Sequence, residues 1–155
     1  LNAVTDNAFV IGLLKDAFLA GVIERGSSGF DGWLLGVSAD WAIPGFSSFS
    51  SSVYLRNTDD VDGNTWQTTF VWGVPFTIKE LDFVIDGFMD IRGHEGQNRG
   101  DILFNPQLKL DVGKLFGYPK LVYSGIEYTY WDNKYGVDGV DERNVSALLQ
   151  VAFSF

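Results

Sequence analysis

Apolar and polar positions alternate with a period of two over long stretches of this chain. In the last stretch, residues 144–155, the apolar positions are Val145, Ala147, Leu149, Val151, Phe153 and Phe155, and the residues between them are mostly small or polar. Because successive side chains of a strand point to opposite faces, this stretch predicts a strand with one apolar and one polar face. A last strand that ends on an aromatic residue is typical of the closing strand of a bacterial outer-membrane barrel.

Other segments follow the same rule. The alternation is clear over residues 33–43, 66–76, 81–92 and 101–112, and weaker over 17–25, 47–57 and 120–132. The chain therefore predicts an all-β fold of about eight antiparallel strands. These strands are about 10–12 residues long, which suits a tilted strand that crosses a bilayer, whereas strands of soluble proteins more often run about 5–6 residues.

Large aromatic residues fall near the ends of the predicted strands. An interfacial girdle would place amphipathic rings there. The girdle residues that we expect are Trp33, Trp41, Trp66, Phe76, Tyr130 and Phe155. A soluble β-sandwich could produce the same alternation with its apolar face inside. Strand length and ring placement favour a transmembrane β-barrel over such a sandwich. The barrel would cross the outer membrane of a Gram-negative bacterium many times and contact lipid and lipopolysaccharide.

The connections between the predicted strands alternate in character. Residues 43–46, 77–80 and 113–119 are short or turn-forming, whereas residues 57–64, 93–100 and 133–143 are longer and polar. Bacterial barrels have short periplasmic turns and longer external loops. Counting back from Phe155 at the periplasmic side assigns each short connection to the periplasm and each long one to the outside.

Composition narrows the function further. The chain of 155 residues has the size of one domain, residues 1–155, and contains no apolar run of the roughly 18 residues that a spanning helix needs. It has no Cys and one His, in a polar loop, so we expect no disulfide, no metal site, no cofactor and no catalytic constellation. The net charge of -9 argues against nucleic-acid polymers as partners.

The predicted inner face carries a surplus of acidic residues. They are Glu24, Asp40, Asp82, Asp86, Asp90, Asp101, Asp111 and Glu127, against the bases Arg56, Arg92 and Lys109. An unpaired charge in a dry core costs several kcal/mol, so this interior must be wet. We interpret the chain as the C-terminal part of a wider barrel whose other strands lie upstream of Leu1. The alternative is a small eight-stranded barrel that does not conduct and acts in structure or adhesion through its outer loops.

Several motifs resemble a known family. Residues 15–21, 32–45, 64–67 and 134–143, together with the aromatic C-terminus, are similar to the nucleoside-specific outer-membrane channels (Tsx-like, OmpK-type). The resemblance implies a monomeric, twelve-stranded barrel, of which about four N-terminal strands would precede this chain. It also implies passive uptake of nucleosides, and use of the outer loops as a receptor by phage or colicin.

A nucleoside pore needs aromatic surfaces for the base and hydrogen-bonding groups for the ribose. The stacking candidates are Tyr54, Phe88, Tyr123 and Trp131, and Asp86, Asn105, Gln107 and Glu127 could meet hydroxyl groups. The other expected pore-lining residues are Arg56, Asp82, Asp90, Arg92 and Lys109. An acidic lumen would admit neutral solutes such as nucleosides and disfavour anionic nucleotides.

Overall fold

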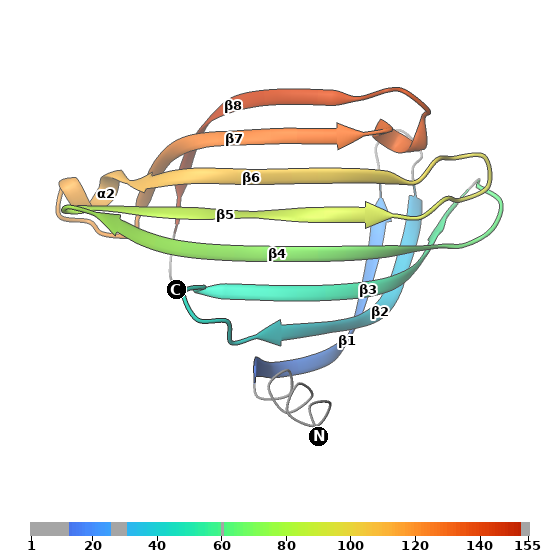
Figure 1. Ribbon diagram of the computed structural model, residues 1–155, viewed down its shortest axis with the longest axis horizontal. Coiled ribbons are helices and arrows are strands. Elements are labelled where there is room, and N and C mark those ends of the chain that lie inside the picture. The colour runs from blue at the N-terminus through green and yellow to red at the C-terminus, as the bar shows by residue number, and fades with distance from the viewer. Residues whose placement is uncertain (1–12, 26–30, 60, 153–155) are drawn as a thin grey trace, which may run out of the picture.

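The structure is a computed structural model that describes residues 13–25, 31–59 and 61–152. Its strands form one antiparallel sheet in chain order (Figure 1). They are β1 (Leu14–Arg25), β2 (Asp31–Trp41), β3 (Ser48–Thr58), β4 (Thr65–Ile78), β5 (Leu81–Arg92), β6 (Asp101–Asp111), β7 (Val122–Asp132) and β8 (Glu142–Val151). The prediction of an all-β, antiparallel fold with about eight strands is confirmed. Phe155, the expected last girdle residue, lies outside the described residues.

Helical structure is minor in the described part of the chain. One helical turn, α2 (Val112–Leu115), follows β6, and a short 3-10 turn, η1 (Lys134–Gly136), follows β7. No helix among residues 13–25, 31–59 and 61–152 is long and apolar enough to cross a membrane. The strands are long, from 10 residues in β8 to 14 in β4.

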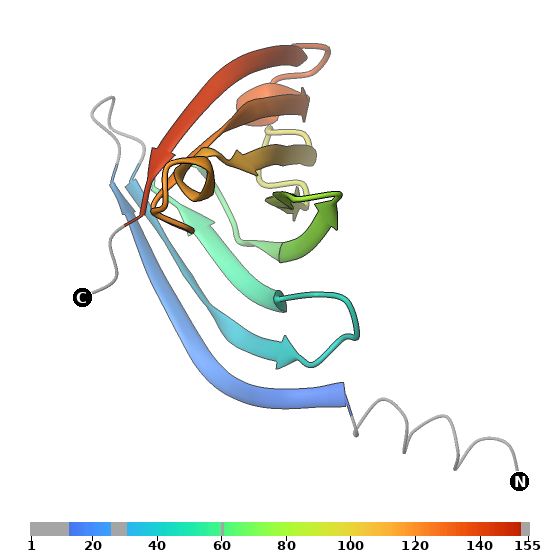
Figure 2. The same ribbon diagram turned by 90° about the vertical axis from the view of Figure 1, so that its left-hand side faces the viewer.

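The sheet bends strongly, so that it encloses a concave side, and Figure 2 shows β1 and β8 at its two edges. Each strand pairs with its neighbours in sequence, and no pairing joins β1 to β8 among the residues described. The described strands therefore form an open, curved sheet and not a closed barrel.

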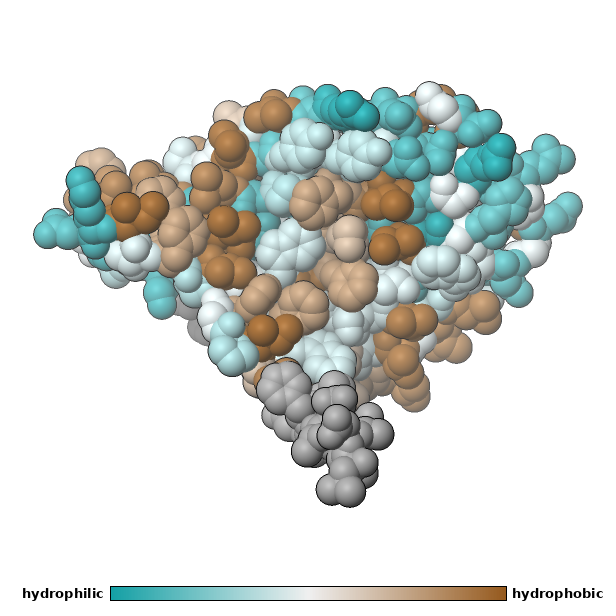
Figure 3. Space-filling view, in the orientation of Figure 1, coloured by the Kyte–Doolittle hydropathy of each residue, from teal (hydrophilic) through white to brown (hydrophobic). Residues whose placement is uncertain are grey.

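The distribution of polar and apolar side chains between the buried and exposed positions is the reverse of that in an ordinary globular domain. Leu34, 4% exposed, is the one buried apolar residue of the described chain. The buried polar residues number eleven: Ser38, Ser52, Arg56, Thr58, Thr65, Gln67, Glu95, Asp101, Asn105, Lys109 and Asp111. Leu19 and Leu35 on the convex face are 83% and 59% exposed. Figure 3 shows hydrophobic side chains over the middle of the strands, with hydrophilic ones gathered toward the end with the β5–β6 and β7–β8 connections.

The period-two alternation explains this inversion. In β6, Asp101, Asn105, Lys109 and Asp111 are buried on the concave side, whereas Ile102 and Leu108 are exposed on the convex side. A soluble sheet with one solvated face does the opposite, because it packs its apolar face inward. The concave face therefore depends on polar contacts and not on an apolar core.

The connections lie at the two ends of the sheet as a meander requires, but their lengths differ from the expectation. The β4–β5 turn spans only residues 79–80. Residues 113–119, expected to be a short or turn-forming connection, lie in a longer connection of residues 112–121 that contains α2 and a loop. The buried Asp111 carboxylate orders this segment, because it accepts hydrogen bonds from the backbone N–H groups of Lys114 (3.0 Å) and Lys120 (2.7 Å). A side-chain anchor thus holds a connection that is longer than expected.

Glycines on the concave face permit the tightest approaches between strands. A Cβ on Gly36 would lie 1.9 Å from the carbonyl oxygen of Val53, and one on Gly125 would lie 2.0 Å from that of Leu108. Both contacts are with the backbone of the neighbouring strand, which cannot move aside as a side chain can. These two positions therefore require glycine if the sheet is to keep its curvature.

We predict that Gly36→Ala lowers the free energy of unfolding by about 1–3 kcal/mol, because the methyl group forces β2 and β3 apart. Gly21→Ala is the control, since its Cβ would meet nothing nearer than 3.8 Å. Urea unfolding in detergent micelles, followed by tryptophan fluorescence, measures both. Equal unfolding midpoints for the two variants would contradict this account of the curvature.

Candidate functional site

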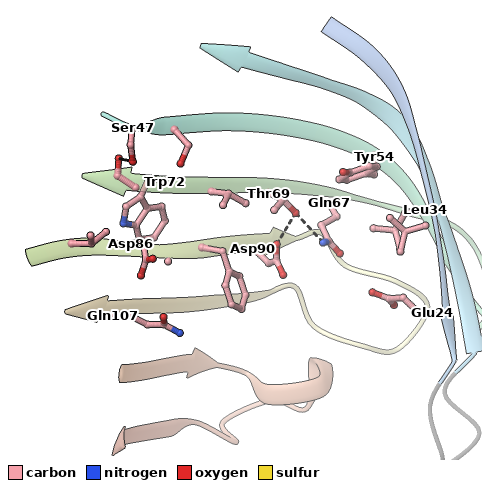
Figure 4. Close-up of a pocket in the computed structure, with 17 residues that line it drawn as sticks. Glu24, Leu34, Ser47, Tyr54, Gln67, Thr69, Trp72, Asp86, Asp90 and Gln107 are labelled. Carbon is pink, nitrogen blue, oxygen red and sulfur yellow. Dashed lines mark hydrogen bonds between the residues drawn. The ribbon is translucent and has the colours of Figure 1, made fainter. Parts of the chain in front are cut away.

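The concave face contains a hollow of about 620 Å³. Its lining comes from six strands, β1 to β6, and includes Glu24, Tyr54, Asp86, Phe88 and Gln107. Figure 4 shows Asp86, Asp90 and Gln107 on neighbouring strands of one wall, with Tyr54, Leu34 and Glu24 on strands across the hollow. Among the described residues that line it, the charged ones are Glu24, Asp86 and Asp90, and none is a Lys or an Arg.

A chain of hydrogen bonds runs along one side of this hollow, from β1 to β5. The Arg56 guanidinium donates to Glu24 at 2.6 Å and to the side-chain oxygen of Gln67 at 3.0 Å. The Gln67 amide donates to Thr69 at 3.1 Å, and the Thr69 hydroxyl donates to Asp90 at 2.6 Å. Arg56 starts on β3 and reaches Glu24 on β1, so its side chain crosses the face of β2. One buried cation therefore ties the edge strand to the middle of the sheet.

Lys109 makes the equivalent link toward the other edge. Its ammonium pairs with Asp86 on β5 and donates to Gln150 on β8 at 2.9 Å. The residue opposite Lys109 on the intervening strand β7 is Gly125, which has no side chain to block this path. The other carboxylate oxygen of Asp86, Oδ1, is buried and has no hydrogen-bond partner in the described chain. A neighbouring pair, Gln107 and Glu127, is joined by a hydrogen bond of 2.6 Å.

A third group of contacts lies at the end of the sheet with the β5–β6 and β7–β8 connections. Arg92 pairs with Asp101 at 2.8 Å, and Asp101 also accepts a hydrogen bond of 3.3 Å from the Trp131 indole. The Arg92 and Lys134 cations lie 5.7 and 5.2 Å from the Trp131 ring centroid. Hydrogen bonding to Glu142 raises the pKa of Lys134 above its ordinary value, so this cation persists at neutral pH. Trp131 is thus held in a cation–π cluster.

The β5–β6 connection folds back onto the end of the sheet. Glu95, which is 6% exposed, accepts hydrogen bonds from the backbone N–H (2.9 Å) and the hydroxyl (2.7 Å) of Thr58. The Arg99 N–H donates to the carbonyl of Gly136 in the β7–β8 connection at 2.8 Å. These contacts hold residues 93–100 across the end of the concave side.

The structure brings some of the expected pore-lining residues together and separates others. Tyr54, Asp86, Phe88, Asp90 and Gln107 line the main hollow. Asp82 and Tyr123 line a second hollow of about 370 Å³ beside the β4–β5 turn. At the opposite end of the sheet, Arg56 and Arg92 line a small cavity of about 50 Å³, and Trp131 is hydrogen-bonded to Asp101 there. Asn105, Lys109 and Glu127 lie on the concave face between these regions, where Asn105 donates to Thr129 at 2.9 Å.

The expected girdle residues lie on the convex face. Trp33, Trp41, Trp66, Phe76 and Tyr130 each lie within the first or last three residues of their strand. Trp66 is half exposed, and the Phe76 and Phe83 rings stack with centroids 5.3 Å apart. The rings are therefore placed at both ends of the strands, on the face that carries the apolar residues.

The charge balance of the concave face differs from the expectation, because α2 supplies a fourth cation. Lys114 pairs with Asp82 at 2.7 Å, in addition to the pairs of Arg56, Arg92 and Lys109. Four of the eight expected acids are paired with a cation. The other four have no cation partner in the described chain: Asp40, Asp90, Asp111 and Glu127. Asp111 is satisfied by two backbone N–H groups.

Several residues of these networks were not among the predicted candidates. Gln67 and Thr69 occupy inward positions of the alternating segment 66–76, so the pattern itself could have identified them. Glu95 and Lys114 lie in connections, where alternation gives no information. No group of three or more metal-ligating side chains occurs among the residues that the structure describes.

Comparison with known proteins adds nothing to this geometry. No family model, no curated protein and no solved structure matches the chain. Its function is therefore argued from the curved sheet, its two faces and the hollow.

We predict that Lys109→Met lowers the free energy of unfolding by about 3 kcal/mol, because it leaves Asp86 without its cation. Lys134→Met is the matched control, since its partly exposed pair with Glu142 is screened by solvent and should contribute little to stability. Adding Asp86→Asn to Lys109→Met should restore part of the loss. Urea unfolding measures all three, and a Lys109→Met effect no larger than that of the control would contradict a structural role for this pair.

Proposed function

We propose that this sheet is part of the wall of an outer-membrane β-barrel, and that the barrel is a diffusion channel for small polar solutes, nucleosides being the expected class. The inverted distribution of polarity carries the proposal. A hydrogen-bonded, charged concave face that surrounds a hollow suits an aqueous lumen, and an exposed apolar convex face suits lipid.

The convex face supports contact with lipid in three ways. Three of its apolar side chains, Leu19, Ile23 and Leu149, are 73–83% exposed, and such a surface is costly to leave in water. The strands, at 10–14 residues, have the length that a tilted crossing needs. Aromatic rings lie near both ends of the strands, where a membrane has its interfaces.

The unpaired edges of β1 and β8 support a barrel of more than eight strands. In a bilayer, backbone groups on an open edge have no water to bond, so a sheet in lipid must close. Eight strands that close on themselves leave an interior filled by side chains, which fits poorly with a hollow of about 620 Å³. β1 and β8 run in opposite directions, so an even number of further strands can bridge them. The twelve-stranded barrel that the resemblance implies satisfies this condition.

The lining of the hollow supports a small polar solute as cargo. Tyr54 and Phe88 offer ring surfaces, while Asp86 and Gln107 offer hydrogen-bonding groups.

A non-conducting receptor barrel is the second candidate, and the packing of the outer connections favours it. Glu95 and Arg99 join residues 93–100 to Thr58 and Gly136, so this end of the sheet presents an ordered surface. Tyr135 and Val137 are exposed on it, as a docking surface for a phage or colicin would require.

Membrane insertion is tested by two arginine substitutions at apolar sites of similar exposure. Leu35 on the convex face is 59% exposed, and Val137 in the β7–β8 connection is 51% exposed. We predict that Leu35→Arg weakens folding into lipid vesicles by about 2–4 kcal/mol, because it places a cation in the hydrocarbon, whereas Val137→Arg has little effect. Urea titration of vesicle-bound protein measures both. Equal effects would contradict a lipid-facing convex surface, and solubility without detergent would end the proposal.

Conduction is tested with the full-length gene product in liposomes. We predict that the protein admits nucleosides and that Phe88→Ala and Asp86→Ala each change the flux by about threefold or more, because both line the hollow. Tyr128→Ala, on the convex face, is the control and should leave the flux unchanged. Unchanged flux in both hollow variants would remove these residues from the path, and absence of any flux or conductance would favour the non-conducting barrel.

A further inference from the structure

The acidic and basic residues of the concave face have different surroundings. Four cations are engaged by carboxylates: Arg56 by Glu24, Arg92 by Asp101, Lys109 by Asp86 and Lys114 by Asp82; Lys120 lines the second hollow, beside the β4–β5 turn. The Arg56 and Lys109 side chains are 8% exposed. None of the four lines the main hollow in the described chain. These four cations are therefore used within the wall, and no Lys or Arg of the described chain lines the main hollow.

Negative charge, in contrast, remains available to the hollow. Asp90 lines it and accepts its one side-chain hydrogen bond from the neutral hydroxyl of Thr69. Asp86 also lines it, but this carboxylate is paired with Lys109, and its other oxygen, Oδ1, is buried. Glu24, although paired with Arg56, is 42% exposed. Glu127, beside the hollow, is bonded to the neutral amide of Gln107.

We propose that the conduit selects by charge: Asp90, with help from Glu127, makes it prefer cationic solutes to neutral ones and exclude anions. The inference rests on the proposed channel function and adds to it the class of solute that passes. A negative lining inside low-dielectric walls raises the local concentration of cations and lowers that of anions, and the effect weakens as salt screens it.

The size and chemistry of the hollow suggest the class of solute more closely. Its acidic groups are accompanied by hydroxyl and amide side chains, namely Ser47, Ser48, Tyr54, Gln67, Thr69 and Gln107. A small polyhydroxylated amine would meet both kinds of group, because its ammonium pairs with a carboxylate and its hydroxyls bond to the rest. A sugar acid of the same size would meet the hydroxyls and be repelled by Asp90, which no cation of the described chain pairs.

Two measurements on the full-length gene product test this. The first is the reversal potential in a KCl gradient across a planar bilayer, which gives the ratio of potassium to chloride permeability. We expect a ratio above about 3 for the native protein, falling at least about twofold in Asp90→Asn and further when Glu127→Gln is added. Asp138→Asn, the same charge change on an outer loop where Asp138 lies 3.5 Å from Arg99, is the matched control and should leave the ratio unchanged.

The second measurement is liposome swelling with glucosamine, glucose and glucuronate, which differ mainly in charge. Entry should be fastest for glucosamine and slowest for glucuronate, and Asp90→Asn should narrow the difference. Conduction with a potassium-to-chloride permeability ratio at or below one, or equal swelling rates for the three sugars, would contradict charge selection but not the proposed channel function. A ratio that Asp90→Asn and Glu127→Gln leave unchanged would overturn the assignment to these residues. No conduction at all would instead overturn the channel itself.

Discussion

The two cation-centred networks of the concave face are the interaction on which the rest of the structure depends. A sheet with a single buried apolar residue in its described part, Leu34, has no hydrophobic core to hold its curvature. Arg56 and Lys109 take over this role, because each reaches across an intervening strand and links an inner strand to an edge strand. Removal of either cation would leave a carboxylate unpaired and would also weaken the attachment of an edge strand. The stability of the fold and the curvature of the sheet therefore depend on the same two side chains.

The same arrangement assigns different solvents to the two faces. Charged networks of this kind are tolerable only if water reaches the carboxylates that no cation of the described chain pairs, such as Asp90 in the lining of the hollow. Exposed leucines on the other face are tolerable only if something apolar covers them. One water-filled side and one lipid side meet both conditions at once. The proposed charge preference has its physical basis in the fold: four cations hold strands together, so the charged groups that line the main hollow are acidic.

Local patterns predicted the strands closely and predicted the networks poorly. The segments 81–92 and 101–112 match β5 (Leu81–Arg92) and β6 (Asp101–Asp111) within one residue, because alternation depends only on neighbouring positions. Alternation also placed Asp86, Phe88 and Asp90 on the inner face. It could not show that Lys114 reaches Asp82, since α2 lies far from that position in sequence and returns to it only in the folded chain. Nor could it show how far the sheet closes, which depends on curvature summed over all strands.

The connections at one end of the sheet bear on where charge discrimination would take place in the proposed channel. At the end closed over by residues 93–100, Arg92 neutralises Asp101, and Glu95 is saturated by two hydrogen bonds from Thr58. The buried carboxylates of this end, Glu95 and Asp101, are therefore already bonded to neighbouring groups of the protein. Asp90 lies further along the sheet, in the lining of the hollow, where it accepts its one side-chain hydrogen bond from Thr69. In the proposed channel a solute would meet the Asp90 charge beyond this end, and a lipid-covered wall of low dielectric constant would strengthen its effect.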